Sequence, residues 1–373
     1  MRILHLTSHL NVGGVSGHIL CLTEALSRRR HEGIIASAGG ELEERVRRAG
    51  IRHWDVPLHT SVEFSPAVFG SALRLAQFLQ REPVDVIHAH TRVGQVVAAL
   101  LSCFFQIPYV ATWHGFFRPN LGRWLWPCTG DRTIAISEPV RQHLLGDFHV
   151  PGERIRLIPH GIDVEHFASL ADPNAQQRLR QQLSLSVDDP VVGTMSRLVA
   201  SKGVDVLIRS FVPVRLAIPK ACLLIVGDGK DRARLERLTQ DLGVGPAVRF
   251  AGTLPESASV LSLMDVFVFL PAVWEGFGLS LLEAMASQRP IVAVRRGGGA
   301  QWVLEDAGVG LLVEPNDQQG LAGAIVQLLQ DRQAATRYAR HAYEVVKKRY
   351  SLTRMVDAVE AVYDELVSEK GSS

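Results

Sequence analysis

The residues with the clearest chemical pattern are two glutamates, Glu275 and Glu283, which flank a glycine-rich turn. Gly276 and Gly278 allow the backbone to approach a ligand closely. The apolar run from Leu279 predicts a helix, whose free N–H groups and positive dipole end suit a phosphate. Helical side chains lean toward the N-terminus, so both carboxylates can accept hydrogen bonds from hydroxyls of one sugar or ribose. The alternative is a chance pairing of a loop glutamate with a helix glutamate.

Two cations follow the predicted strand 191–195, at the end where a parallel sheet binds ligands. Arg197 offers a fork to phosphate oxygens, and Lys202 offers a mobile point charge. Together they could neutralise a leaving diphosphate, although two surface cations near a turn would look the same. The sequence has no Asp-x-Asp pair of the kind that holds a nucleotide sugar through a divalent metal. We therefore expect no metal at the diphosphate and no other cofactor.

A second candidate region lies in the first third of the chain. Gly13 and Gly14 follow the first predicted strand, where they indicate close approach of a phosphate or sugar, or simply a tight turn. The GxGxxG fingerprint of dinucleotide-binding proteins is absent. His88 and His90 lack a third metal ligand at a recognisable spacing, so packing explains them better than a metal site. His114 is the better functional candidate, as a donor to a sugar hydroxyl or a stabiliser of developing charge.

The segment 116–126 is rich in aromatic residues and arginine, and turn residues interrupt it. We expect a loop. It suits contact with an acceptor or a membrane interface, where tryptophan and arginine are favoured, but it could equally be a loop packed under its own domain.

The elements that must position these residues alternate between strand-like and helix-like patterns. Nearly continuous apolar strands of this kind are typical of parallel sheets buried on both faces. The predicted strands are 3–7, 33–38, 84–89, 109–112, 133–136, 155–158, 191–195, 221–226, 248–251, 266–270, 291–294 and 310–313. Two such series indicate an α/β protein with two open parallel sheets. If the carboxyl ends of their strands face each other, the ligand site is the cleft between the domains.

Length and composition agree with two globular domains. The chain has 373 residues, 47% of them hydrophobic and 21% charged. We place the junction at the start of a polar segment, giving domains 1–167 and 168–351. A net charge of +2 argues against a nucleic-acid binder, and four scattered cysteines indicate neither a disulfide framework nor a zinc site. The short apolar N-terminus differs from a signal peptide, so we expect a cytoplasmic protein that could still touch a membrane surface.

Taken in order, these motifs resemble glycosyltransferase family 4, the retaining enzymes of the GT-B fold with two Rossmann-like domains. The glutamate motif is the most specific of them. The others are Gly13–Gly14, Thr112–Gly115, Ala135–Ser137, Ile158–Asp163, Ser196–Arg197, Lys202–Gly203, Val226–Gly229, Gly297–Gly299 and Val313–Asp317. The match spans nearly the whole chain.

The resemblance implies a role for each candidate residue, with Arg197, Lys202, Glu275 and His114 at the reacting centre. Arg197 and Lys202 would grip the diphosphate, Glu275 would bind the sugar, and His114 would contact that sugar near its anomeric carbon. The remaining donor contacts would come from Gly14, Gly227, Phe277, Gly278, Leu279, Ser280 and Glu283, the last on the ribose. A final helix within 352–373 would pack back on the first domain.

Two departures from the family pattern are Gln301, where many relatives have Glu, and His160, where many have Asn. Neither touches the proposed diphosphate grip. The resemblance implies transfer from a nucleotide-diphosphate sugar to a saccharide or lipid-linked acceptor, in the synthesis of cell-envelope polysaccharide or lipopolysaccharide. The alternatives are a non-catalytic sugar-nucleotide-binding scaffold and a GT-B epimerase or phosphorylase.

Overall fold

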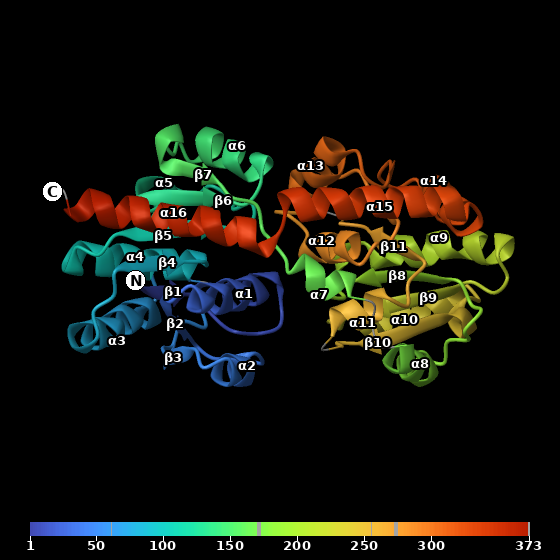
Figure 1. Cartoon of the computed structure of the whole chain (residues 1–373), viewed down its shortest axis with the longest axis horizontal. Helices are drawn as coiled ribbons and strands as arrows, with labels where there is room; N and C mark the ends of the chain where they lie inside the picture. Colours follow the sequence, from blue (N-terminus) through green and yellow to red (C-terminus); the bar gives the residue numbers. More distant parts are fainter. Residues whose placement is uncertain (61, 170–172, 255, 272–274, 372–373) are drawn as a thin grey trace. The chain divides into compact units, whose positions relative to one another are not determined.

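The computed structural model describes residues 1–373 except 61, 170–172, 255, 272–274 and 372–373 (Figure 1). The chain folds into two compact α/β units. The N-terminal unit comprises Met1–Gly161 and Leu352–Ser373, and the C-terminal unit comprises Ile162–Ser351. The sequence placed the junction after residue 167. The structure divides the chain after Gly161, because the short helix α7 (Val164–Ala168) packs on α12 (Leu279–Ala286) of the C-terminal unit.

The N-terminal unit is built on a seven-stranded parallel sheet in the order β3-β2-β1-β4-β5-β6-β7. Its strands are β1 (Arg2–Leu6), β2 (Glu32–Ser37), β3 (Arg52–Asp55), β4 (Val86–Ala89), β5 (Tyr109–Trp113), β6 (Arg132–Ala135) and β7 (Ile155–Leu157). Alternate residues of β1 enter two different apolar clusters, Leu4 and Leu6 in one and Ile3 in the other. Both faces of this sheet are therefore buried, as the apolar strands predicted.

The helices of the N-terminal unit include the last helix of the chain, α16 (Leu352–Gly371). Its buried residues Met355, Val359 and Tyr363 share a cluster with Ile3 of β1 and with Leu22 of the first helix of the chain. Figure 1 shows α16, in red, running across this sheet. The other helices are α1 (Gly14–Arg28), α2 (Glu43–Arg48), α3 (Pro66–Arg81), α4 (Arg92–Phe105), α5 (Leu121–Leu125), α6 (Glu138–Asp147) and a 3₁₀ turn (Gly152–Arg154).

The C-terminal unit has a six-stranded parallel sheet in the order β10-β9-β8-β11-β12-β13. Its strands are β8 (Val191–Met195), β9 (Cys222–Val226), β10 (Val248–Gly252), β11 (Val266–Phe269), β12 (Ile291–Val294) and β13 (Leu311–Val313). Its helices are α7, α8 (Pro173–Gln182), α9 (Val204–Ala217), α10 (Arg232–Asp241), α11 (Ser257–Leu261), α12 (Leu279–Ala286), α13 (Gly298–Ala307), α14 (Gln318–Gln330) and α15 (Arg332–Arg349), with 3₁₀ turns at Ala200–Lys202 and Gly245–Ala247.

In each sheet the strand order reverses direction beside the first strand, between β1 and β4 and between β8 and β11. This is the doubly wound arrangement in which ligands bind beyond the carboxyl ends of the strands at the switch point. The expected α/β class with two Rossmann-like domains is confirmed. Among the described residues, no helix combines the length and apolarity needed to cross a membrane.

The predicted loop 116–126 was partly wrong. It contains the short helix α5, whose start is capped by Asn120, because the Asn120 side chain accepts a hydrogen bond from the Arg123 N–H at 2.9 Å. Arg123 pairs with Glu63, and Trp126 stacks on Phe64 with ring centroids 6.0 Å apart. The segment is thus packed on either side of Trp124, whose side chain is 62% exposed.

Candidate functional site

The C-terminal unit brings Lys202 and Glu275 together. Lys202 lies in the turn after β8, and Glu275 follows the neighbouring strand β11. The Lys202 Nζ is 2.5 Å from Oε1 of Glu275, and each side chain is about one-fifth exposed (20% and 22%). The two groups therefore form an accessible ion pair at the switch point of the second sheet. Residues 272–274, immediately before Glu275, lie outside the described part of the chain.

The triple glycine after β12 holds the backbone of Glu275. The Gly299 N–H donates to the Glu275 carbonyl at 2.8 Å. Gly298 has φ +79°, and a Cβ there would lie 2.5 Å from the same carbonyl oxygen. Only glycine fits this contact. The departure at Gln301 also has a local explanation, because Gln301 Oε1 accepts the Gly297 N–H at 2.5 Å at the start of α13.

Arg197 lies in the loop after β8, which packs against the loop after β9. Gly227, at φ +122°, passes so close that a Cβ would lie 2.0 Å from the Ser196 carbonyl oxygen. The Leu198 N–H donates to the Asp228 carbonyl at 2.9 Å, which joins the two loops. The exposed Arg197 guanidinium forms no hydrogen bond or ion pair with any residue that the structure describes. It is therefore available to an anion.

Helix α12 starts at Leu279 beside this ion pair, with Gly278 as its N-cap. Gly278 has φ +92°, and a Cβ there would lie 2.9 Å from Cζ of Phe269. No side chain caps this helix start, so its first N–H groups, including that of Ser280, are open to a ligand. Phe277 is buried under the turn, with its ring against Tyr350.

Glu283 lies one turn into α12, where sequence analysis placed it. Burial, and secondarily the charge of Glu256, raises the pKa of its carboxyl to about 7. A carboxylate that titrates near neutrality inside a ligand site is suited to accept hydrogen bonds from hydroxyl groups once a ligand fixes it in the ionised form.

The N-terminal unit gathers six histidines, of which sequence analysis considered three as site residues and named a fourth, His160, as a departure from the family pattern. They lie on or directly after four strands and in the first turns of α1, at the switch point of the first sheet. They are His5, His18, His88, His90, His114 and His160. All but His114 are at least nine-tenths buried, and burial lowers the pKa of each ring below its ordinary value. The six imidazoles are therefore neutral at pH 7.

Both ring nitrogens of His114 lie against other histidines. Its Nε2 lies 3.3 Å from Nδ1 of His90, and its Nδ1 lies 3.3 Å from Nε2 of His160. His88 contacts the Tyr363 hydroxyl and the Thr112 hydroxyl, each at 2.6 Å. A sugar hydroxyl that binds His114 must therefore share or replace one of its histidine contacts.

The tertiary structure supplies the third ligand that the sequence did not show for a metal site at His88 and His90. Their ligand atoms lie within 4.8 Å of one another together with those of His5, and a second group is formed by His18, His90 and His114. Sequence spacing could not reveal these groups, because each joins a histidine on or directly after β4 to histidines of α1 or on or directly after other strands. Both ring nitrogens of His88 already face hydroxyls, and those of His90 face different imidazoles.

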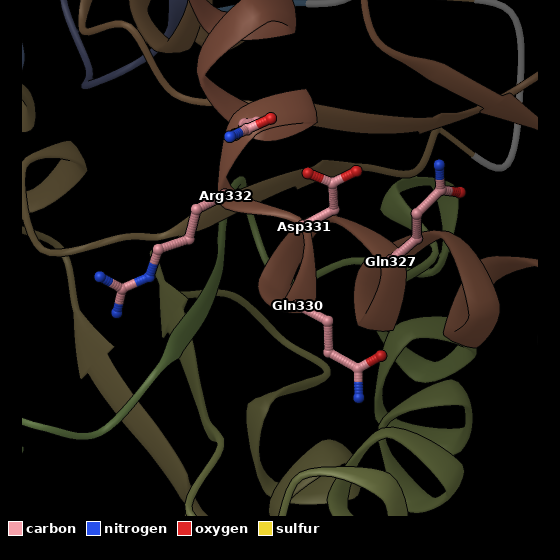
Figure 2. Close-up of a pocket in the computed structure, with 5 residues that line it drawn as sticks. Gln327, Gln330, Asp331 and Arg332 are labelled. Carbon is pink, nitrogen blue, oxygen red and sulfur yellow. The ribbon is translucent and has the colours of Figure 1, made fainter.

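Gly14 begins α1, which no side chain caps, and the preceding loop is fixed by Glu41, which accepts the Val12 N–H at 2.9 Å. A hollow elsewhere in the C-terminal unit, at the junction of α14 and α15 (Figure 2), contains none of the predicted site residues. Its lining is polar and consists of Gln327, Gln330, Asp331, Arg332 and Gln333.

Comparison with known families decides what this arrangement belongs to. Residues 12–166 match the model of Glycosyltransferase Family 4, and residues 175–345 match the model of Glycosyl transferases group 1. The chain is a glycosyltransferase of the family 4 type. The resemblance inferred from the motifs is thereby confirmed.

Curated relatives share this description. A lipopolysaccharide core biosynthesis glycosyltransferase, LpsE of Rhizobium meliloti, is 35% identical over 191 residues, which cover 51% of this chain and 53% of that protein. A GDP-mannose-dependent phosphatidylinositol monomannoside mannosyltransferase of Mycolicibacterium smegmatis is 37% identical over half of each chain. This chain thus aligns with about half the length of these two relatives. An uncharacterized glycosyltransferase of Methanocaldococcus jannaschii is 26% identical over 94% of both chains.

Solved structures agree in fold. HepE of Anabaena, crystallised with UDP and glucose, superposes with a TM-score of 0.84 over 98% of this chain and 99% of its own, at 23% identity. WaaG, a glycosyltransferase of lipopolysaccharide biosynthesis, gives a TM-score of 0.75 over 98% and 99%, at 16% identity. These neighbours confirm the GT-B fold of the family 4 enzyme.

Proposed function

We propose that this glycosyltransferase moves a sugar from a nucleotide-diphosphate donor to a saccharide or lipid-linked acceptor, with retention of the anomeric configuration. The observation that carries the proposal is the grouping at the carboxyl edge of the second sheet. There Arg197, which has no partner among the described residues, a lysine–glutamate pair and a helix start without a side-chain cap follow adjacent strands. This set matches the needs of a donor, which are neutralisation of a diphosphate and acceptance of hydrogen bonds from sugar hydroxyls.

The donor contacts divide by charge. Arg197 and Lys202 bind the diphosphate, with the N–H groups at the start of α12, and the close approach of Gly227 to Ser196 holds the loop that carries Arg197. Glu275 binds the sugar and Glu283 the ribose. Because Arg197, Lys202 and the start of α12 supply positive charge themselves, the donor needs no divalent metal. The UDP in the HepE structures supports a nucleotide-sugar donor for this chain as well.

The transfer step depends on positioning and electrostatics. The bond between the anomeric carbon and the diphosphate oxygen breaks, and its electron pair leaves with the diphosphate. The acceptor oxygen bonds to the same face of that carbon through an oxocarbenium-like state, and the departing phosphate takes the acceptor proton. Arg197 and Lys202 stabilise the growing negative charge, while His114 contacts the transferred sugar.

We place the acceptor in cell-envelope synthesis, at the cytoplasmic face of a membrane. LpsE and the mannosyltransferase, whose names refer to lipopolysaccharide and phosphatidylinositol, support this class. Exposed apolar side chains of the N-terminal unit support peripheral membrane contact. Trp124 is 62% exposed, and Phe64, which is 45% exposed, adjoins the same segment through Gly122 and Trp126. Tryptophan and phenylalanine at such positions favour the membrane interface.

A thermal-shift panel of UDP, GDP and ADP sugars tests the proposal, because a ligand that binds only the folded state raises the melting temperature. We expect the sugars of one nucleotide to raise the melting temperature. The enzyme should then turn that donor over when acceptor extracts are added, with retention of the anomeric configuration. Binding without any turnover would favour the scaffold, and conversion of donor alone would favour an epimerase.

A further inference from the structure

The histidines of the N-terminal unit form a chain of ring-to-ring contacts. His5 Nδ1 lies 3.1 Å from His90 Nε2, and His90 Nδ1 lies 3.3 Å from His114 Nε2. The chain continues from His114 Nδ1 to His160 Nε2 at 3.3 Å and from His160 Nδ1 to His18 Nδ1 at 2.9 Å. Each inner ring uses its two nitrogens on two different neighbours. The contacts therefore form a line of N–H···N hydrogen bonds and do not converge on one point.

Proton positions along such a line depend on one another. A neutral imidazole has one N–H donor and one bare nitrogen acceptor, so every ring must donate in the same direction. His5 Nε2 at one end is buried without a partner among the described residues. Orphaned N–H groups are rarer in native structures than orphaned acceptors, which favours a bare His5 Nε2 and donation from His5 toward His18. In this order His114 carries its proton on Nδ1, and its Nε2 is bare.

His160 is the residue that extends the line past His114. It stacks on His114 with ring planes 12° apart, and its centroid is 4.3 Å from that of His18. Without the acceptor at His160 Nε2, the Nδ1–H of His114 would lose its partner, and either tautomer of His114 could form.

We propose that His160 is a positioning residue that fixes His114 as the Nδ1–H tautomer, so that His114 presents its bare Nε2 to the transferred sugar as a hydrogen-bond acceptor. This inference rests on the proposed function of His114. It assigns His114 the opposite polarity to the donor role that the sequence suggested. The sugar hydroxyl would then take the place of the His90 N–H on that nitrogen.

The kinetic test compares His160→Ala and His160→Asn in wild-type and His114→Ala backgrounds, with the donor found by the thermal-shift panel. His160→Ala should lower kcat/KM about tenfold, as expected when a buried N–H loses its acceptor. His160→Asn should recover most of that loss, because its Oδ1 can accept the same N–H. In the His114→Ala background, His160→Ala should have little further effect. Equal losses in both backgrounds would refute the coupling.

A spectroscopic arm is independent of turnover. Nitrogen-15 NMR of labelled histidines should show His114 protonated on Nδ1 in the wild type and as a mixture of tautomers in His160→Ala. His53→Ala, which removes a histidine of β3 bonded to Ser37, serves as a matched control and should leave the His114 signal unchanged. A wild-type His114 protonated on Nε2, or Zn²⁺ bound stoichiometrically by these rings, would overturn the proposal. If no donor is turned over, the proposed function fails, but the NMR experiment still tests whether His160 fixes the tautomer of His114.

Discussion

Replacing Lys202 by alanine should separate its part in folding from its part in transfer. The Lys202–Glu275 pair is about one-fifth exposed on both sides (20% and 22%), so solvent screens it. Pairs this accessible contribute at most about 1 kcal/mol to stability. In a unit of this size that free energy corresponds to a drop of about 2–4 °C in melting temperature. Loss of one group that stabilises developing charge costs about 2.7–4 kcal/mol in the barrier, or a 100- to 1,000-fold drop in kcat.

The assay is initial-rate kinetics on Lys202→Ala beside its thermal unfolding curve, with Lys220→Ala as the control. Lys220 is an exposed lysine of the same unit outside the candidate site. We expect Lys202→Ala to lose activity far out of proportion to stability, and Lys220→Ala to lose neither. EDTA should leave the wild-type rate unchanged, because the proposed grip uses side chains and amide groups.

The refuting results are specific. A Lys202→Ala enzyme within threefold of the wild-type kcat, a difference of only about 0.6 kcal/mol, would remove the lysine from the transition state. A rate abolished by EDTA and restored by Mg²⁺ or Mn²⁺ would show that a metal neutralises the diphosphate. Parallel loss of activity and of melting temperature by more than 10 °C would mean that the pair mainly supports the fold.

Four further predictions concern Arg197, Glu283 and Trp124. Arg197→Ala should weaken binding of the nucleoside diphosphate by about 1.5–3 kcal/mol. The melting temperature should not change, because the Arg197 guanidinium has no partner to lose among the described residues. Calorimetry would measure both quantities, and an unchanged affinity would contradict the prediction. Burial raises the pKa of the Glu283 carboxyl to about 7, and ribose hydroxyls bind its ionised form better. The affinity for a nucleoside should therefore rise from pH 6 to pH 8 in the wild type and stay constant in Glu283→Gln. The same raised pKa means that the folded state holds a proton the unfolded chain has released, so this group's contribution to stability should fall from pH 4.5 to pH 7, which urea unfolding would detect. Trp124→Ser should reduce co-sedimentation with anionic vesicles without altering donor binding, and equal sedimentation of both proteins would argue against contact at Trp124.

The sequence predicted most of the apolar strands because burial on both faces leaves a continuous run. Val191–Met195 was placed with the bounds that the structure gives β8, and the helix predicted from Leu279 begins at that residue as α12. The edge strand β3 was missed, since Arg52–Asp55 is mostly polar and only Trp54 is buried. Helix α13 was missed for another reason. Its start is formed by glycines, which have low helix propensity and look like a loop until the contact between Gly298 and Glu275 is seen.

The candidate site could likewise be predicted only in part. Motifs contiguous in sequence, such as the turn between Glu275 and Glu283, carry their own geometry, because a strand end and a helix start are fixed by nearby residues. The pairing of Lys202 with Glu275 depends on β8 and β11 being neighbours, which strand order alone decides. A sequence can name both residues without revealing that the free protein holds the lysine against the carboxylate.

The histidines show most clearly what the sequence could not predict. There is also a physical reason why so many of them occur together. A charged ring in this largely buried group would be costly, so the group is tolerated only while all six imidazoles are neutral and hydrogen-bonded. Each ring added to the line therefore requires another acceptor or donor next to it. His160 meets that requirement for His114, and His18 meets it for His160. A substitution at one member must change the hydrogen bonding of the next, which is why the role of His114 cannot be assigned from its own position in the sequence.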